Sequence, residues 1–155
     1  MSIFVRTDMP VPPGTASISS TTVNSGTIDY TTPTIYWRNF SVDAYSEATI
    51  ASLTITLTKR SVVIIVVSSF MSLQYSNVFR HIIRVNGTAV YISPYDPDTR
   101  AQLRVHATHV VLSPGTHTIE YRVFNGSDTP RGVSVGAAGS DLPALTLLVF
   151  VIPLE

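Results

Sequence analysis

The sequence predicts an all-β protein, a two-sheet antiparallel sandwich of jelly-roll type. Its apolar residues occur in short, strand-length runs separated by Thr, Ser, Pro and Gly, and no run follows the helical period. Turn signals divide the chain into about eight to ten short strands, as expected of a sandwich. A chain of 155 residues is most simply one domain. An immunoglobulin-like sandwich is the alternative, although the Cys-Trp-Cys pattern of that fold is absent and the single Trp37 lies early.

The first 33 residues differ in composition from the rest of the chain. A Ser/Thr-rich tract with few apolar residues spans residues 15–32. Four prolines surround it: Pro10, Pro12, Pro13 and Pro33. Because proline lacks a backbone donor and fixes φ, we predict residues 1–33 to be an extended arm that adds to the sheet edge of a neighbouring subunit, or else the first strands. Residues 34–155 are predicted to be the sandwich domain.

Three runs indicate strands that line the core. Residues 53–58 alternate strictly, with three apolar side chains on one face and three threonines on the other. The runs 62–67 and 144–152 are apolar on both faces, which predicts burial on both sides, in a central strand or at a subunit contact. The predicted interface residues are Val62, Ile64, Val66, Leu147, Val149 and Val151.

Two hairpins are predicted from turn residues. Asn86-Gly87 tolerates positive φ at both positions, so strands 81–85 and 88–92 should close as a type I′ hairpin. A second hairpin is predicted around Ser113-Pro114-Gly115, between strands 103–112 and 116–124, and a short strand at 131–135 follows.

The composition combines many apolar residues with few charges. Hydrophobic residues make up 45% of the chain and charged residues 13%, about half the usual share of roughly 25%. Ten acidic and ten basic side chains give a net charge of zero, so charge repulsion does little to keep copies apart. We therefore expect a homo-oligomer whose interface uses part of this apolar excess.

The sequence disfavours nucleic-acid binding, membrane spanning and secretion. The nine arginines and the single lysine, Lys59, form no basic cluster of the kind that nucleic acid requires. The longest apolar run is far shorter than the roughly 20 residues of a membrane-spanning helix. The N-terminus does not show a secretory signal pattern, so synthesis in the cytoplasm is expected.

Candidate catalytic and metal-binding residues are few. Four histidines could bind a metal or act as a base: His81, His106, His109 and His117. Alternation on a strand sends His106 and His109 to opposite faces, while His117 lies across the Pro114-Gly115 turn, where it could approach either of them. Asp96-Pro97-Asp98 matches part of a calcium loop but lacks the glycine and the distal glutamate, which favours a surface turn. We therefore predict no catalytic residue, no metal and no cofactor.

One enzyme class stays open. Two carboxylates that hydrolyse glycosides pair in space rather than in sequence, so spacing does not exclude them. The pool of glutamates is small: Glu47, Glu120 and Glu155.

Aromatic residues that could stack on a sugar form two clusters, one of Tyr30, Tyr36, Trp37, Phe40 and Tyr45 and the other of Tyr91 and Tyr95. Tyr91 and Tyr95 are candidates for facing a ligand, although packing in the core or an interface is the default role of such rings. A carbohydrate- or receptor-binding sandwich is therefore the alternative to a structural protein.

The C-terminal half reads VVLSPGTHTIEYRVFNG and then VSVGAAGSDLPALTLLVFVI. It resembles a segment of phage and archaeal-virus structural proteins, over residues 52–152 and most specifically over 114–123. The resemblance implies a jelly-roll domain related to trimeric C1q/TNF-like domains, although their aromatic-glycine signature near the end is absent here. It implies a non-enzymatic virion subunit, in a capsid, decoration, spike, turret or fibre knob. The implied partners are further copies, other virion proteins and a host-surface glycan or receptor.

Overall fold

Ten strands form in the described part of the chain. The computed structural model describes residues 17–22, 38–136 and 145–154, of which 17–22 and 38–40 through their backbone alone. The described residues contain no helix, and so none that could cross a membrane. The strands are β1 (Ser17–Thr22), β2 (Arg38–Val42), β3 (Glu47–Leu57), β4 (Ser61–Leu73), β5 (Phe79–Val85), β6 (Thr88–Ile92), β7 (Gln102–Leu112), β8 (Gly115–Asn125), β9 (Arg131–Val135) and β10 (Leu145–Pro153).

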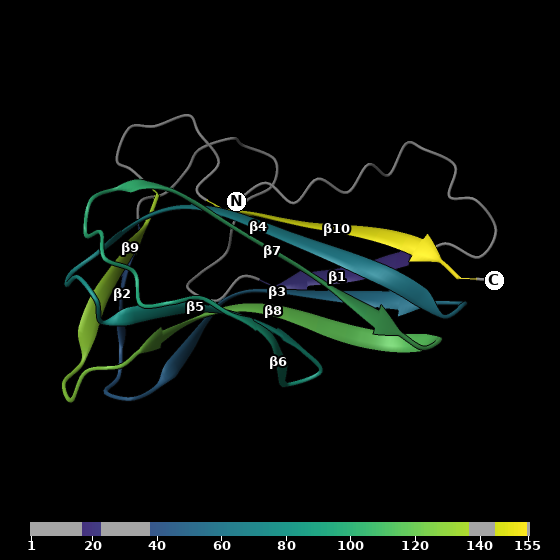
Figure 1. Ribbon diagram of the computed structural model, residues 1–155, viewed down its shortest axis with the longest axis horizontal. Coiled ribbons are helices and arrows are strands. Elements are labelled where there is room, and N and C mark those ends of the chain that lie inside the picture. The colour runs from purple at the N-terminus through teal and green to yellow at the C-terminus, as the bar shows by residue number, and fades with distance from the viewer. Residues whose placement is uncertain (1–16, 23–37, 137–144, 155) are drawn as a thin grey trace.

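The strands build two antiparallel sheets that face each other (Figure 1). We call them sheet A, in the order β1-β3-β8-β5-β6, and sheet B, in which β4 is central. Strand β7 follows one edge of β4, while β10 and then β9 follow the other, with β2 beyond β9. The predicted two-sheet antiparallel sandwich of jelly-roll type is confirmed.

The core lies between the sheets and is built by alternation. In β4 every second side chain is inward, and Val63, Ile65 and Val67 are fully buried. Opposite them, β3 and β8 contribute Leu53 and Ile119 among others. Fully burying such a side chain is worth about 1.5–3 kcal/mol. Burial of every second side chain therefore fixes which face of each strand points to the core.

The predicted Asn-Gly hairpin is confirmed. Asn86 has φ of 50° and Gly87 has φ of 80°, the positive values of a type I′ turn, and β5 pairs with β6 on either side. Because both requirements of the turn lie in two adjacent residues, the local sequence suffices to predict it.

The prediction of a second hairpin is wrong. Strand β7 pairs with β4 in sheet B, whereas β8 pairs with β3 and β5 in sheet A. The Ser113-Pro114 link therefore crosses from one sheet to the other. Alternation identifies both segments as strands, but it carries no information about which sheet each joins.

The predictions for the N-terminal arm and for the last strand can be compared with the structure only over the described residues. Residues 17–22 form β1, an edge strand of sheet A beside β3. The other residues of the proposed arm, and residues 137–144 of the predicted bend, lie outside the described residues. Within the described chain β10 pairs with β4 alone, so it is an edge strand rather than a central one, and contact with another subunit stays a proposal.

Candidate functional site

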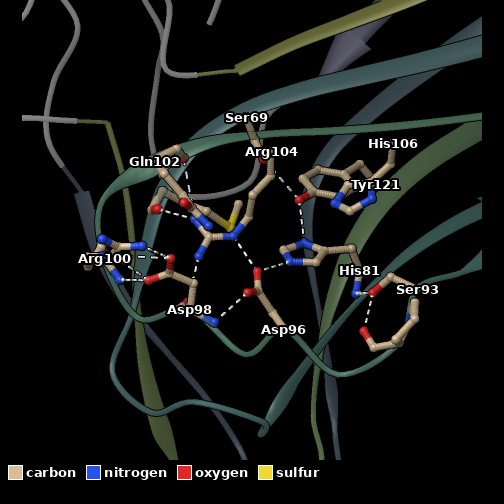
Figure 2. A network of polar contacts seen from close by, with 12 residues as sticks. Ser69, His81, Ser93, Asp96, Asp98, Arg100, Gln102, Arg104, His106 and Tyr121 are labelled. Atoms are coloured by element: carbon tan, nitrogen blue, oxygen red, sulfur yellow. Dashed lines mark hydrogen bonds and ion pairs between the residues drawn. The ribbon is translucent and has the colours of Figure 1, made fainter.

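Two of the four histidines meet between the sheets. His81 projects inward from β5 and His106 from β7, and their rings stack with centroids 4.4 Å apart (Figure 2). Spacing in the sequence gives no hint of this pair, because the two strands belong to different sheets. The prediction that His106 and His109 point to opposite faces is confirmed, since His109 is exposed on the outer side of β7.

An aspartate from the β6–β7 connection joins this pair to a buried arginine. Asp96 accepts hydrogen bonds from His81 Nε2, at 3.1 Å, and from Arg104 Nε on β7. Arg104, whose side chain is 4% exposed, also donates to the carbonyl oxygens of Met71 and Asp98. The charge of Arg104 is therefore paired and hydrogen-bonded, as a buried charge must be.

The network continues to the centre of sheet A. Tyr121 on β8 places its Oη 2.7 Å from His81 Nδ1 and 3.2 Å from Ser69 Oγ on β4. With Nε2–H donated to Asp96, the other nitrogen of His81 accepts from the tyrosine, which in turn accepts from the serine. This assignment satisfies all three groups with a neutral His81.

Burial controls the protonation of the network. It lowers the pKa of His81, against the opposing effect of Asp96, and lowers the pKa of His106 to about 4, with the neighbouring imidazole of His81 adding to the shift. Burial alone would raise the pKa of Asp96, but hydrogen bonds from Arg104, the backbone and His81 outweigh it and lower that pKa. The groups thus hold one another in fixed charge states, and we interpret the network as a support that joins the two sheets.

The other candidates for chemistry are engaged elsewhere. His117 on β8 lies 2.9 Å from Asn86 Nδ2 and 2.8 Å from the Ser113 carbonyl oxygen. Asp98 pairs with Arg100, and these hydrogen bonds lower its pKa to about 2. In the described ranges no group of three or more His, Cys, Asp or Glu could hold a metal ion.

Neither of the tyrosines considered as ligand-facing presents a free ring. Tyr91 packs against the core and its Oη lies 3.1 Å from His106 Nδ1. The guanidinium of Arg80 covers the ring of Tyr95 at 4.0 Å, and Tyr95 lies so close to Gly126 that a Cβ there would be 2.6 Å from its Oη.

A different pair of tyrosines is exposed where three turns meet. The turns are residues 43–46 between β2 and β3, 74–78 between β4 and β5, and 126–130 between β8 and β9. Backbone hydrogen bonds link them, from Tyr45 N to Ser127 O at 3.1 Å and from Gly126 N to Val78 O at 2.9 Å. We call this region the loop end.

Tyr45 is the most unusual residue of the loop end. It is 66% exposed, and its φ of 50° lies in the left-handed region that glycine or asparagine normally occupies. The turn around it is held by the bond from Ser46 N to Asp43 O and by the bond to Ser127. An aromatic ring therefore stands in solvent on a firmly held backbone.

Tyr75 is tied to the same region through an arginine. The guanidinium of Arg131 lies 4.0 Å above the Tyr75 ring, and Arg131 Nε is 3.3 Å from Ser127 Oγ. Ser127 thus connects Tyr75 and Arg131 with the backbone of Tyr45. The sequence placed Tyr45 in a cluster of aromatic residues that could stack on a sugar, but gave no sign of its exposed position, and it gave no signal for Tyr75.

A second candidate surface is the outer side of sheet B. Val62, Ile64 and Val66 point outward there and are half-buried. Leu147, Val149 and Val151 instead pair with the inward residues of β4 and pack on the core side. The apolar outer residues of β10 are Leu148, Phe150 and Ile152, so the predicted interface shifts by one residue along this strand.

Comparison with known proteins gives similarity to solved structures alone. No protein-family model and no curated protein matches the sequence. A family 35 carbohydrate-binding module from an environmental isolate is 9% identical, with a TM-score of 0.47, 92% of this chain covered and 94% of that one. The CBM36-1 domain of a multidomain xylanase from the hindgut metagenome of Trinervitermes trinervoides is 13% identical, with a TM-score of 0.36 and coverages of 69% and 90%.

A third structure belongs to an exo-β-1,3-galactanase from Phanerochaete chrysosporium, solved with β-1,3-galactotriose. It is 10% identical, with a TM-score of 0.29, and 62% of this chain covers 28% of that one. At such identities and TM-scores these similarities carry no functional argument.

Proposed function

We propose that this chain is a non-catalytic β-sandwich module that binds carbohydrate through its loop end. The observation that carries the proposal is Tyr45, because neither the backbone nor the core accounts for a tyrosine at that position. Carbohydrate binding is the alternative that the sequence predicts.

The backbone at Tyr45 disfavours the residue that occupies it. A non-glycine residue in the left-handed region costs roughly 1–2 kcal/mol. Core packing does not offset this cost, since the side chain is 66% exposed. Residues held in sparsely populated conformations cluster at ligand sites. The exposed ring is therefore the functional part of this turn.

The neighbouring side chains suit a saccharide. The face of an aromatic ring is negative and packs against the C–H groups on one side of a sugar ring, and Tyr45 supplies such an exposed ring. Tyr75 is partly exposed beside it, with Arg131 over one face of its ring. Hydroxyl or carboxylate groups of a sugar need polar partners close by, and the guanidinium of Arg131, which Ser127 helps to position, provides one. Because Arg131 is cationic, an acidic saccharide has one more favourable contact than a neutral one.

The variant Tyr45→Gly tests the proposal. Glycine adopts positive φ without strain but gives the unfolded chain more freedom, so the free energy of unfolding should change by less than about 1 kcal/mol. Removing the ring should weaken saccharide binding by about tenfold or more. Calorimetric titration with neutral and uronic-acid oligosaccharides measures the affinity, and thermal unfolding measures the stability.

Asn86→Gly is the matched control. Asn86 also has positive φ, but it lies in the β5–β6 turn at the opposite end of β5, so this change should leave saccharide affinity unchanged. The proposal fails if none of these saccharides binds the wild-type chain, or if Tyr45→Gly binds as tightly as wild type.

A structural subunit of a virion is the second candidate function. The apolar outer side of sheet B favours it, since this side leaves Phe150 and Ile152 about half exposed. The virion setting is what the C-terminal resemblance implies. Electron microscopy of material co-purified from infected cells tests it, with the chain in a regular particle as the expected result and its absence from particles as the contrary one.

A further inference from the structure

We infer that the outer face of sheet B is a self-association surface, which docks on the same face of a second copy. This inference goes beyond carbohydrate binding and holds whether or not the loop end takes a saccharide. It rests on the composition of the face, on its contrast with sheet A, and on the way β7 is oriented.

The outer face of sheet B is apolar across three paired strands. Pairing sets Phe150 and His109 on either side of Ile64, and Ile152 and Val111 on either side of Val62. On β10, β4 and β7 this face contains a single titratable side chain, His109. Its apolar residues are Leu148, Phe150 and Ile152 on β10, Val62, Ile64, Val66 and Phe70 on β4, and Leu103, Val105, Ala107 and Val111 on β7.

The outer face of sheet A is charged and polar, in contrast to the apolar outer face of sheet B. Glu47 of β3 pairs with Arg84 of β5 at 2.5 Å and with Arg122 of β8 at 3.4 Å, and Arg122 also pairs with Glu120. Threonines of β3 and β8 continue this face, as in the pair Thr56 and Thr116. One face of the sandwich thus carries ion pairs that suit water, and the other carries none.

Strand β7 shows that the apolar face is not a by-product of the fold. It buries Arg104 and His106 and exposes Leu103 and Val105, each about 60% exposed. Burying those polar groups requires the partners that Asp96, His81 and Tyr91 supply. The reverse orientation of β7 would put Leu103 and Val105 in the core. Packing within one chain therefore does not explain why they are exposed, whereas contact with a partner does.

A second copy is the partner that matches this face. A face without Asp, Glu, Lys or Arg has no charge for a charged partner to complement, and the same face of another copy is equally apolar. The zero net charge of the chain removes repulsion between copies. One patch that binds itself forms a two-fold, isologous contact, which predicts a dimer rather than the trimer that the resemblance implies.

The size of the face predicts weak association. Strands β10 and β4 pair over nine residues, and β7 adds a third strand of similar length. With a strand spacing of about 4.8 Å and a rise of about 3.4 Å per residue, the three strands cover roughly 400 Å². Stable interfaces bury about 800 Å² on each partner. The dimer should therefore form and dissociate with concentration.

Sedimentation equilibrium over a concentration series tests the inference on the full chain. Wild type should pass from monomer to dimer mass, and Phe150→Asp should weaken dimerisation by about tenfold or more, because it buries an unpaired charge. Ile92→Asp is the matched control, since Ile92 is as exposed as Phe150 but lies on β6 of sheet A; it should dimerise like wild type.

A labelling measurement keeps the test independent of whether the aspartate variants fold. The chain has no cysteine, so Phe150→Cys and Ile92→Cys each introduce a single thiol. Labelling of the thiol in Phe150→Cys should slow as protein concentration rises, while that in Ile92→Cys should not change.

The inference is overturned by a wild type that stays monomeric at every concentration, by a trimer as the associated species, or by equal weakening by Phe150→Asp and Ile92→Asp. A monomer that dimerises after residues 1–16 are deleted also overturns it, and identifies that segment as the occupant of the face. Saccharide binding by Phe150→Asp should equal that of wild type, so failure here is distinguishable from failure of the loop-end site.

Discussion

Asp96→Ala should reduce the free energy of unfolding by about 3–5 kcal/mol. The aspartate is the acidic partner of Arg104, and the side chains of the two are 10% and 4% exposed. Without it the guanidinium stays buried with carbonyl partners alone, and His81 Nε2 loses its acceptor. An uncompensated buried charge is among the few causes of so large a loss. Urea unfolding, followed by circular dichroism, measures the change.

Asp98→Ala provides the matched control from the same segment. Asp98 pairs with Arg100, whose side chain is 82% exposed, and because solvent screens such a surface pair the loss should be much smaller than for Asp96→Ala. The carbonyl oxygen of Asp98 that accepts from Arg104 remains in this variant. Equal destabilisation by the two changes, or a loss below about 1 kcal/mol for Asp96→Ala, would contradict the role given to the network.

Acidification should destabilise the folded chain between about pH 6.5 and pH 4. His106 has a folded pKa of about 4, below the ordinary 6.5, because it is buried and stacks on His81. The unfolded chain therefore binds a proton at a pH where the folded chain does not, so this stability is complete above pH 6.5 and is lost as pH falls. After allowance for the partial exposure of His106, we expect a loss of about 2 kcal/mol.

The acid effect has two internal checks. His106→Phe keeps an aromatic ring beside His81 and removes the titrating group, so stability should fall less steeply with acid than in wild type. His109→Ala changes an exposed histidine of the same strand and should keep the wild-type slope. A wild-type stability that is constant from pH 6.5 to pH 4 would refute the neutral buried pair.

The predictable part of the fold is the part that local sequence determines. Two adjacent residues, Asn86 and Gly87, define one turn, and alternation in residues 53–58 identifies a strand and its inward face. The apolar run 62–67 identifies a strand, but not which of its faces is inward. The sandwich follows because such strands must cover one another. Sheet membership is not local, since the chain near Pro114 can either return beside β7 or cross to the other sheet, and here it crosses.

The polar network between the sheets could not be predicted from the sequence, because it too depends on which strands lie next to each other. Strand β7 alternates between apolar and polar residues, and the usual interpretation places Leu103 and Val105 inside. The structure does the reverse, because Asp96 and His81 come from other elements to pair the polar side chains. A signal was present in Arg104 and His106, two residues apart and thus on one face, but the face could be assigned only once the neighbouring strands were known.

Tyr45 was beyond the reach of sequence patterns. Its importance depends on a positive φ and on exposure, and neither follows from Ala44-Tyr45-Ser46 as letters. The tyrosines singled out in the sequence, Tyr91 and Tyr95, occur beside a strong strand signal. In the structure Tyr91 contacts His106 and Tyr95 contacts Arg80.

The most direct measurement of the central claim is a residue-by-residue map of saccharide contact on the intact chain. Amide chemical shifts should be recorded while neutral or uronic-acid oligosaccharides are added. The account predicts that the largest, saturable changes fall on residues 43–46, 74–78 and 126–131, and that Tyr45→Gly removes them. Changes centred on the ion-paired face of sheet A instead, or no change at the loop end with any of these saccharides, would contradict it.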